Sequence, residues 1–161
     1  MSGKIVHGVP ASAPDLTWLH DNALESVERV DEWNWTFDFR DGGVIYGSEL
    51  KWRLTTDAGI VVTSFDDGHP FGLGAPVDAC RRVMDTVGQS EIKLVEVCER
   101  TGDLVLSFAN GAQLEFLNLS CGYESWATVH GDDNYICMGG GGFCKVEDGP
   151  PPEWAPEGGK P

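Results

Sequence analysis

The sequence predicts an α+β protein that is mainly antiparallel β-sheet, and three observations support this fold class. Large apolar residues alternate with polar ones over short stretches, as they do in strands with one buried face. Turns rich in Gly and Asp separate these stretches. The same order of short helix, hairpin, tryptophan and final strand occurs twice. We therefore expect an internal duplication of a short helix and about five strands, built as two packed small sheets or one continuous sheet.

Length, composition and net charge limit the domain organisation and the class of partner that can be expected. The chain has 161 residues, of which 41% are hydrophobic, and this is enough for one domain with a proper core. Its 26 acidic and 11 basic residues give a formal net charge of −15. Such a surface repels phosphate backbones, so nucleic-acid binding is not expected. The charge would suit a basic partner, or it would simply keep the protein soluble. Four segments are predicted: a flexible arm (1–14), a first β-rich repeat (15–75), a second repeat packed on it as a single domain (76–147), and a Pro/Gly-rich tail (148–161).

The first repeat begins with a short predicted helix from Asp15 to about Ala23, with Asp15 as its N-cap. A strand is predicted next, around Val27 to Val30. The stretch from Trp33 to Phe39 then places four aromatic residues on alternate positions, which predicts a half-buried strand. The remaining elements of this repeat are a turn at 41–43, a partner strand at 44–50 and two further hairpin arms near 52–54 and 60–63.

The second repeat begins with a predicted amphipathic helix over 78–87, which Pro76 precedes and Gly88 ends. Asn110-Gly111 between two alternating stretches is a strong hairpin signal. We expect the folded region to end at the glycine run 139–142. The other predicted strands of this repeat lie at 92–97, 126–129 and 135–138.

A constant offset relates the two hairpins. Phe39 aligns with Phe108, and a shift of 69 residues also matches four neighbouring pairs. Trp52 matches Trp126 once the second copy gains five residues, which places an insertion at 120–125. The final strands are then matched as 60–62 with 136–138.

No constellation of residues predicts catalysis, a metal site or a cofactor. The four histidines are scattered, and Asp66-Asp67-Gly68-His69 lacks the pattern of a calcium loop, so it is interpreted as an acidic turn. Cys121 with His130 would be a nucleophile and base only in an electropositive setting, which this acidic chain does not suggest. The glycine run 139–142 lacks the spacing of a phosphate-binding loop.

The compartment is predicted from segments that the sequence lacks. Residues 1–14 contain no run of 7–15 apolar residues, and no later segment approaches 18. The five cysteines are an odd number without a C-x-x-C pair. We therefore expect a cytoplasmic protein with reduced, mostly buried thiols and no membrane contact.

The most distinctive peptide is Gly122-Tyr123-Glu124-Ser125-Trp126. In one interpretation Trp126 simply fills the core, as Trp52 would in the other repeat. In the other, Tyr123 and Glu124 are exposed beside a rigid sheet and form a recognition loop. The pattern F-x-[DN]-G followed by this GYESW-type run resembles small bacterial proteins encoded near polymorphic or contact-dependent toxins. The resemblance covers mainly residues 104–139 and more loosely 33–63.

The resemblance implies an immunity protein: a cytoplasmic binding protein, not an enzyme, that neutralises a cognate toxin domain by occluding its active site. Its partner would be basic, since the chain is acidic. Tyr123, Tyr135 and Trp154 are candidate aromatic anchors. The predicted toxin-binding residues, all in or beside expected loops, are Asp66, Asp67, Tyr123, Glu124, Asp132, Asp133 and Tyr135.

Two alternatives stay open. One is a small-molecule-binding or enzymatic domain with a pocket between the two repeats, in which Asp66, His69, Cys121 and His130 would converge. The other is a module that pairs with itself through an edge strand. A monomer or a weak dimer is expected in either case.

Overall fold

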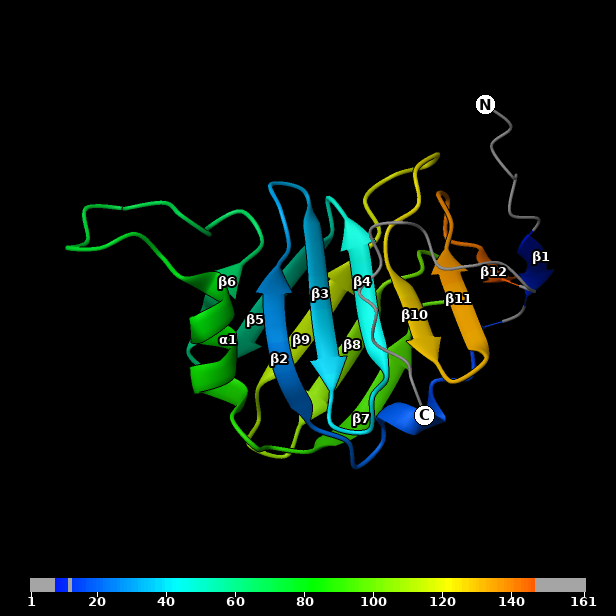
Figure 1. Ribbon diagram of the computed structural model, residues 1–161, viewed down its shortest axis with the longest axis horizontal. Helices are drawn as coiled ribbons and strands as arrows, with labels where there is room; N and C mark the ends of the chain where they lie inside the picture. Colours follow the sequence, from blue (N-terminus) through cyan, green and yellow to red (C-terminus); the bar gives the residue numbers. More distant parts are fainter. Residues whose placement is uncertain (1–7, 12, 147–161) are drawn as a thin grey trace.

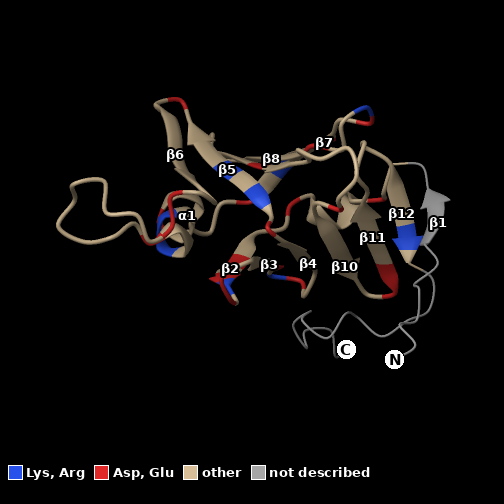
Figure 2. Ribbon diagram, turned by 90° about the horizontal axis from the view of Figure 1, so that it is seen from above, with Lys and Arg blue, Asp and Glu red and all other residues tan. Residues whose placement is uncertain are grey.

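The computed structural model describes residues 8–11 and 13–146, which form two antiparallel sheets packed face to face (Figures 1 and 2). The larger sheet has the strand order β1-β12-β11-β10-β4-β3-β2, and the smaller has the order β6-β5-β9-β8-β7. The predicted fold class is confirmed. The strands of the larger sheet are β1 (Gly8–Ala11), β2 (Leu24–Arg29), β3 (Asn34–Phe39), β4 (Val44–Ser48), β10 (Ala127–His130), β11 (Asp133–Cys137) and β12 (Phe143–Val146). Those of the smaller sheet are β5 (Lys51–Thr56), β6 (Gly59–Thr63), β7 (Ile92–Val97), β8 (Leu104–Phe108) and β9 (Gln113–Leu117).

The helix α1 (Ala79–Val87) closes one open side of the sandwich, where it packs against β2 and β6 (Figure 2). Its start is capped by the Asp78 side chain, which accepts the N–H of Arg81 at 2.9 Å, and Gly88 ends it with a φ of +53°. The helix predicted over 78–87 is therefore confirmed.

The helix predicted from Asp15 to Ala23 is wrong in length, since only a 3-10 turn at Thr17–Leu19 forms. Asp21 adopts a φ of +58°, which ends the helical path. Ala23 is already extended and forms an antiparallel bridge with Glu91, just before β7.

Two three-stranded meanders, β2–β3–β4 and β7–β8–β9, share several features. Each has a register shift at the same place in its first pair of strands, opposite Phe39 in one and Phe108 in the other. Each turns at a glycine with a φ of +91°, Gly42 and Gly111. These equivalences agree with the offset of 69 residues. The duplication itself stays a prediction.

The chain crosses between the sheets twice, in opposite directions. After β4 it leaves the larger sheet, and β5 pairs with β9; after β9 it leaves the smaller sheet, and β10 pairs with β4. The two sheets therefore do not correspond to the sequence halves 15–75 and 76–147. The predicted match of Ile60 with Ile136 is out of register. If Trp52 matches Trp126, the next residues, Arg53 and Ala127, also match. Arg53 faces Thr63 and Ala127 faces Ile136, so Thr63 and not Ile60 corresponds to Ile136.

One hydrophobic cluster spans the two sheets and α1. At its centre, Trp52 makes edge-to-face contacts with Trp35 and Phe37, at centroid distances of 5.0 and 5.5 Å. Phe37 in turn contacts Phe116 at 4.9 Å. Trp126 is also fully buried. Both matched tryptophans therefore belong to the core.

Several predictions at the edges of the fold need correction. The residues 8–11 of the predicted flexible arm form β1, which pairs with β12, and β12 itself lies beyond the expected end at Gly142. Trp33 is exposed because it lies in the turn before β3. All five cysteines are free, but Cys98 and Cys121 are exposed and not buried. The predicted tail over 148–161, with Trp154, lies outside the described residues.

Candidate functional site

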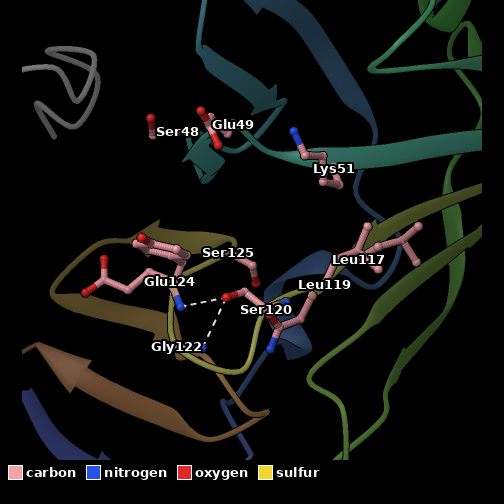
Figure 3. A pocket seen from close by; sticks show the side chains of 11 residues that line it. Ser48, Glu49, Lys51, Leu117, Leu119, Ser120, Gly122, Glu124 and Ser125 are labelled. Carbon is pink, nitrogen blue, oxygen red and sulfur yellow. Dashed lines mark hydrogen bonds between the residues drawn. The ribbon is translucent and has the colours of Figure 1, made fainter.

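A large cavity lies between the two segments that cross from sheet to sheet. We name the segment Ser48–Lys51 the first crossing and the segment 117–126 the second crossing. Both lie at the upper end of the sandwich in Figure 1, which we name the crossover end. The cavity, named the crossover cleft, has a volume of about 860 Å³ and is open to solvent. Its lining comes from both crossings (Figure 3): Ser48, Glu49, Lys51, Leu117, Asn118, Leu119, Ser120, Gly122, Tyr123, Glu124 and Ser125.

Short-range hydrogen bonds hold the backbone of the second crossing. The Ser120 hydroxyl accepts the N–H groups of Gly122 and Tyr123, at 3.1 and 2.8 Å (Figure 3). The Ser120 carbonyl accepts the N–H of Gly140, and the N–H of Ser125 donates to the carbonyl of Cys137. The loop is therefore fixed at both of its ends, which lowers the entropy that its side chains lose on binding.

The glycine run 139–142 supports this loop by close approach. A Cβ at Gly139 would overlap the backbone of Gly122, and one at Gly141 would overlap the carbonyl of Arg100. Gly140 and Gly141 also have positive φ values of 85° and 100°. These close contacts and positive φ values give a structural reason for the glycine run.

Beneath the loop, Asn118 ties three segments together. Its side-chain amide donates to the carbonyls of Thr101 and Met138, and its own N–H donates to the carboxylate of Asp103, all within 3.0 Å. Trp126 adds a hydrogen bond of 2.7 Å from its indole N–H to the carbonyl of Gly102. The floor of the crossover cleft is thus a rigid part of the sandwich.

Two carboxylates and one ammonium group line the cleft. Glu49 and Glu124 are exposed, and the ammonium of Lys51 lies 5.1 Å from the centre of the Phe65 ring. Burial, together with the Glu124 carboxylate, raises the pKa of the Tyr46 phenol on the neighbouring strand. The carboxylate of Glu124 is thus close enough to β4 to influence a buried group.

The aromatic ring of Tyr123 is the most exposed large apolar group that the structure describes, with 82% of the residue accessible. Leu119 beside it is 69% exposed. Together they form an apolar rim next to the carboxylates. Such a mixture of anchored aromatic, apolar and charged groups is typical of a binding surface.

The described residues that line the crossover cleft include no histidine and no cysteine. Its hydroxyl groups are Ser48, Ser120, Ser125 and Tyr123. Among the residues that the structure describes, no group of three or more His, Cys, Asp or Glu side chains could hold a metal ion. The arrangement supports binding through shape and charge.

The residues that the catalytic alternative requires do not converge. His69 stacks on Phe71 at 5.4 Å in the segment between β6 and α1, at the left of Figure 1. His130 lies at the other end of the sandwich, where its Nε2 is 3.0 Å from Asp41 and its ring stacks on Trp18. Cys121 is exposed in the second crossing.

The predicted contact residues fall into three groups. Tyr123 and Glu124 are exposed and line the crossover cleft. Asp132 and Asp133 follow β10, whereas Tyr123 and Glu124 precede it, so the two pairs lie at opposite ends of that strand. The seven residues therefore do not form one surface.

Four of the predicted residues, Asp66, Asp67, Asp133 and Tyr135, make contacts within the chain. Asp133 pairs with Lys145 at 2.8 Å, and the same ammonium lies 5.8 Å from the Tyr135 ring. Asp67 pairs with Arg29 at 3.1 Å, and its carboxylate also accepts the N–H of Ala79. The Asp66 carboxylate accepts the N–H of Thr63.

Sequence reasoning missed the opposite wall of the cleft, which Ser48, Glu49 and Lys51 form. The match between Trp52 and Trp126 could have indicated this wall. If the two tryptophans are equivalent and the two crossings lie side by side, the residues just before Trp52 lie opposite the insertion at 120–125. That step needs the knowledge that the two crossings lie side by side, which no local pattern contains.

A second, smaller cavity of about 390 Å³ lies on the outer face of the smaller sheet. Arg53 and Glu115 pair across it in a two-pronged contact, in which Arg53 Nη2 lies 3.0 Å from Glu115 Oε1. The exposed thiol of Cys98 is at its rim, and hydrogen bonds from Thr101 lower the pKa of this thiol. Because its main charges already neutralise one another, this cavity is a weaker candidate.

Comparisons of the chain with protein-family models, with curated proteins and with solved structures found no significant match. The resemblance to immunity-type proteins therefore stays a prediction. None of the helices in the described part of the chain is long and apolar enough to cross a membrane. The functional conclusion consequently rests on the geometry of the crossover end.

Proposed function

We propose that the protein is a cytoplasmic binding protein of the immunity type, which neutralises a basic bacterial toxin domain by covering its active site, and that it is not an enzyme. One observation carries the proposal: an 82% exposed tyrosine is held on an anchored loop, beside carboxylates, at the crossover cleft. A tyrosine offers a large contact area at the cost of only two torsions, which is why tyrosines often dominate binding energy.

Charge supports the same class of partner. The cleft presents Glu49 and Glu124, and the whole chain carries a formal charge of −15. A basic partner would be steered toward the protein, which raises its association rate at low salt. Anionic substrates and nucleic acids would be repelled.

The test uses the protein encoded immediately upstream and its C-terminal domain. We expect that domain to stop growth of a bacterial host and wild-type co-expression to restore it. Tyr123→Ala should weaken binding of the purified domain about 30-fold, since a central tyrosine is worth roughly 2 kcal/mol or more. Asp132→Ala, at the other end of β10, is the control and should bind as the wild type does. Loss of rescue by the wild type, or equal binding by Tyr123→Ala, would contradict the proposal.

A second candidate, binding of a small cationic molecule, is favoured by the position of the cleft between segments from the two sequence halves. Its volume is also within the range of roughly 300–1,000 Å³ that is usual for ligand sites. Calorimetric titration with spermidine and with arginine would test it. A micromolar Kd that Glu49→Gln abolishes would favour this candidate over the toxin-binding one.

A further inference from the structure

Exposed large apolar side chains concentrate at the crossover end. Nine such residues occur among the described ones, and seven of them belong to turns at this end. The other two, Ile60 and Leu94, lie on β6 and β7. The seven are Val30 and Trp33 between β2 and β3, Phe65, Phe71 and Leu73 between β6 and α1, and Leu119 and Tyr123 in the second crossing. Scattered apolar residues are normal on a surface, but a concentration at one end indicates an interaction site.

Part of this surface is a projection with a defined shape. The segment Gly68–Val77, which we name the finger, extends beyond α1 and both sheets at the left of Figures 1 and 2. Two backbone hydrogen bonds close its neck: Gly68 N–H to the Val77 carbonyl at 2.8 Å, and Val77 N–H to the His69 carbonyl at 2.9 Å. At its tip the N–H of Leu73 donates to the carbonyl of Pro70 at 2.7 Å.

The backbone of the finger is strained in a way that directs its tip. Phe71 has a φ of +39°, which is rare for a bulky residue, and Gly72 follows with +72°. This turn leaves Phe71 64% and Leu73 51% exposed. Strain of this kind concentrates at functional segments, since folding alone gains nothing from exposing two large apolar groups.

The base of the finger is anchored by the acidic pair that the sequence offered as contact residues. Asp67 bonds to Arg29 and to the N–H of Ala79 at the start of α1, and Asp66 bonds to the N–H of Thr63 at the end of β6. The finger is therefore presented by the elements on either side of it. It is ordered before it meets a partner, and this reduces the entropic cost of binding.

The composition of the finger selects its partner. It contains no Asp, Glu, Lys or Arg, although 23% of the chain is charged. A convex, uncharged projection requires a concave apolar groove on the other side. A second copy of this chain is disfavoured because it would bring two surfaces of charge −15 together, with Glu49 and Glu124 flanking its own concave surface. Anionic membranes are repelled for the same reason.

The finger and the crossover cleft belong to one continuous surface. Phe65 stands at the base of the finger, and the Lys51 ammonium that lies over its ring also lines the cleft. The N–H of Glu49 in turn donates to the carbonyl of Trp33, which brings a further exposed aromatic residue to the rim. One partner can therefore contact both.

We propose that the finger is the second contact of the protein: it inserts Phe71 and Leu73 into an apolar groove of the same basic partner domain that the crossover cleft engages. This inference rests on the proposed function. The two contacts act differently, because the cleft contributes charge and the finger contributes apolar burial. Charge acts mainly on the association rate, and burial acts mainly on the dissociation rate.

The test measures binding kinetics of the C-terminal domain of the upstream-encoded protein at low and high salt. The double variant Phe71→Ser/Leu73→Ser, which adds no charge, should dissociate at least 100-fold faster, with its association rate nearly unchanged and with the same loss at both salt concentrations. Glu124→Lys should instead slow association, and salt should diminish its effect. The matched control Ile60→Ser/Leu94→Ser alters two other exposed apolar residues and should bind as the wild type does.

Four outcomes would overturn the inference. If the wild type binds and the finger variant matches it within threefold, the finger has no role, while the proposed function stands. If the wild type does not bind the domain, both fail. Concentration-dependent dimerisation in analytical ultracentrifugation that the finger variant abolishes would assign the finger to a second copy. Co-sedimentation of the wild type alone with phosphatidylcholine vesicles would assign it to a membrane surface. Circular dichroism melting checks that each variant is folded, and all substituted side chains are exposed.

Discussion

The two crossings perform the same task with different lengths of chain. The first passes from β4 to β5 with only two residues, Glu49 and Leu50, between the strands. The second passes from β9 to β10 with nine residues, 118–126. Each connects the third strand of a meander to a strand of the other sheet. Because the shorter connection is sufficient for the fold, the additional residues of the second crossing are available to form the crossover cleft and its tyrosine.

The two crossings also differ in backbone strain and in the hydrogen bonding of their matched tryptophans. Glu49 adopts a φ of +52°, which is unfavourable for a residue with a side chain. The indole N–H of Trp52, which follows the first crossing, is buried and has no acceptor, whereas that of Trp126 donates to Gly102. The short crossing thus carries backbone strain that the long crossing avoids, whereas an unsatisfied buried group occurs at each: the Trp52 indole N–H and the Ser125 hydroxyl.

The largest effect is expected where the second crossing rests on the glycine run. Gly139→Ala should destabilise the protein by about 3 kcal/mol, because its Cβ would overlap the backbone of Gly122 and no side-chain rotation relieves that contact. Urea unfolding followed by tryptophan fluorescence would measure it.

The matched control is Gly122→Ala, on the other side of the same contact. A Cβ there has no atom within 4 Å, so its effect should be within roughly 0.5 kcal/mol. Neither glycine has a positive φ, so both substitutions report on space alone. Equal stability of the two variants would show that the loop is not seated on Gly139.

The next effect separates the two tryptophans. Trp126→Phe leaves the carbonyl of Gly102 without its indole donor, whereas Trp52→Phe removes an N–H that has no acceptor. Both substitutions leave similar cavities, since both residues are buried to the same degree. Trp126→Phe should therefore cost about 1–2 kcal/mol more than Trp52→Phe. Thermal unfolding of both variants would measure the difference, and a larger loss for Trp52→Phe would reverse the comparison.

Sequence reasoning predicted the elements that local pattern determines. The alternation around Asp41 to Gly43 and around Asn110-Gly111 specifies a hairpin in each case, and the capping residue Asp78 with Gly88 specifies α1. It did not predict that β5 pairs with β9 and β10 with β4. Pairing between distant strands depends on which faces are buried together, and an alternating strand is equally suited to several neighbours.

Only one wall of the crossover cleft could be predicted from the sequence, because the other wall depends on pairing between distant strands. Tyr123 and Glu124 belong to the insertion at 120–125, which is visible when the two tryptophans are matched. Glu49 and Lys51 reach the cleft from the opposite wall, through non-local packing. The pairing of Asp67 with Arg29 could not be predicted, because the two residues are 38 positions apart in the sequence. The glycine run was taken as the end of the fold because close backbone contact leaves the same signature as a loose segment.

A smaller effect of opposite sign is expected in the first crossing. Glu49→Gly should stabilise the protein by roughly 0.5–1 kcal/mol, because glycine adopts the positive φ of this position without steric cost. Glu49→Ala removes the same carboxylate but keeps the Cβ, so it should bring no such gain. If both variants were equally stabilised in urea unfolding, relief of charge repulsion would be the cause and not the backbone.

The smallest effect is expected on the pKa of Tyr46 when Glu124 is changed. Tyr46 lies in β4, from which the first crossing starts, and Glu124 lies in the second crossing. Burial and the Glu124 carboxylate together raise the pKa of Tyr46 in β4 above its usual value of 10.0. A folded-state pKa above the unfolded value contributes stability that is fully present below the unfolded pKa and is lost as pH rises through the folded one. In Glu124→Gln the folded-state pKa of Tyr46 should fall, so this loss should be smaller and should be complete at a lower alkaline pH. Absorbance of the phenolate during alkaline titration measures the shift, with Glu49→Gln as the control. An identical titration of Glu124→Gln and the wild type would mean that the second crossing does not lie over β4 in solution, and the crossover cleft would then not have the wall that carries Tyr123.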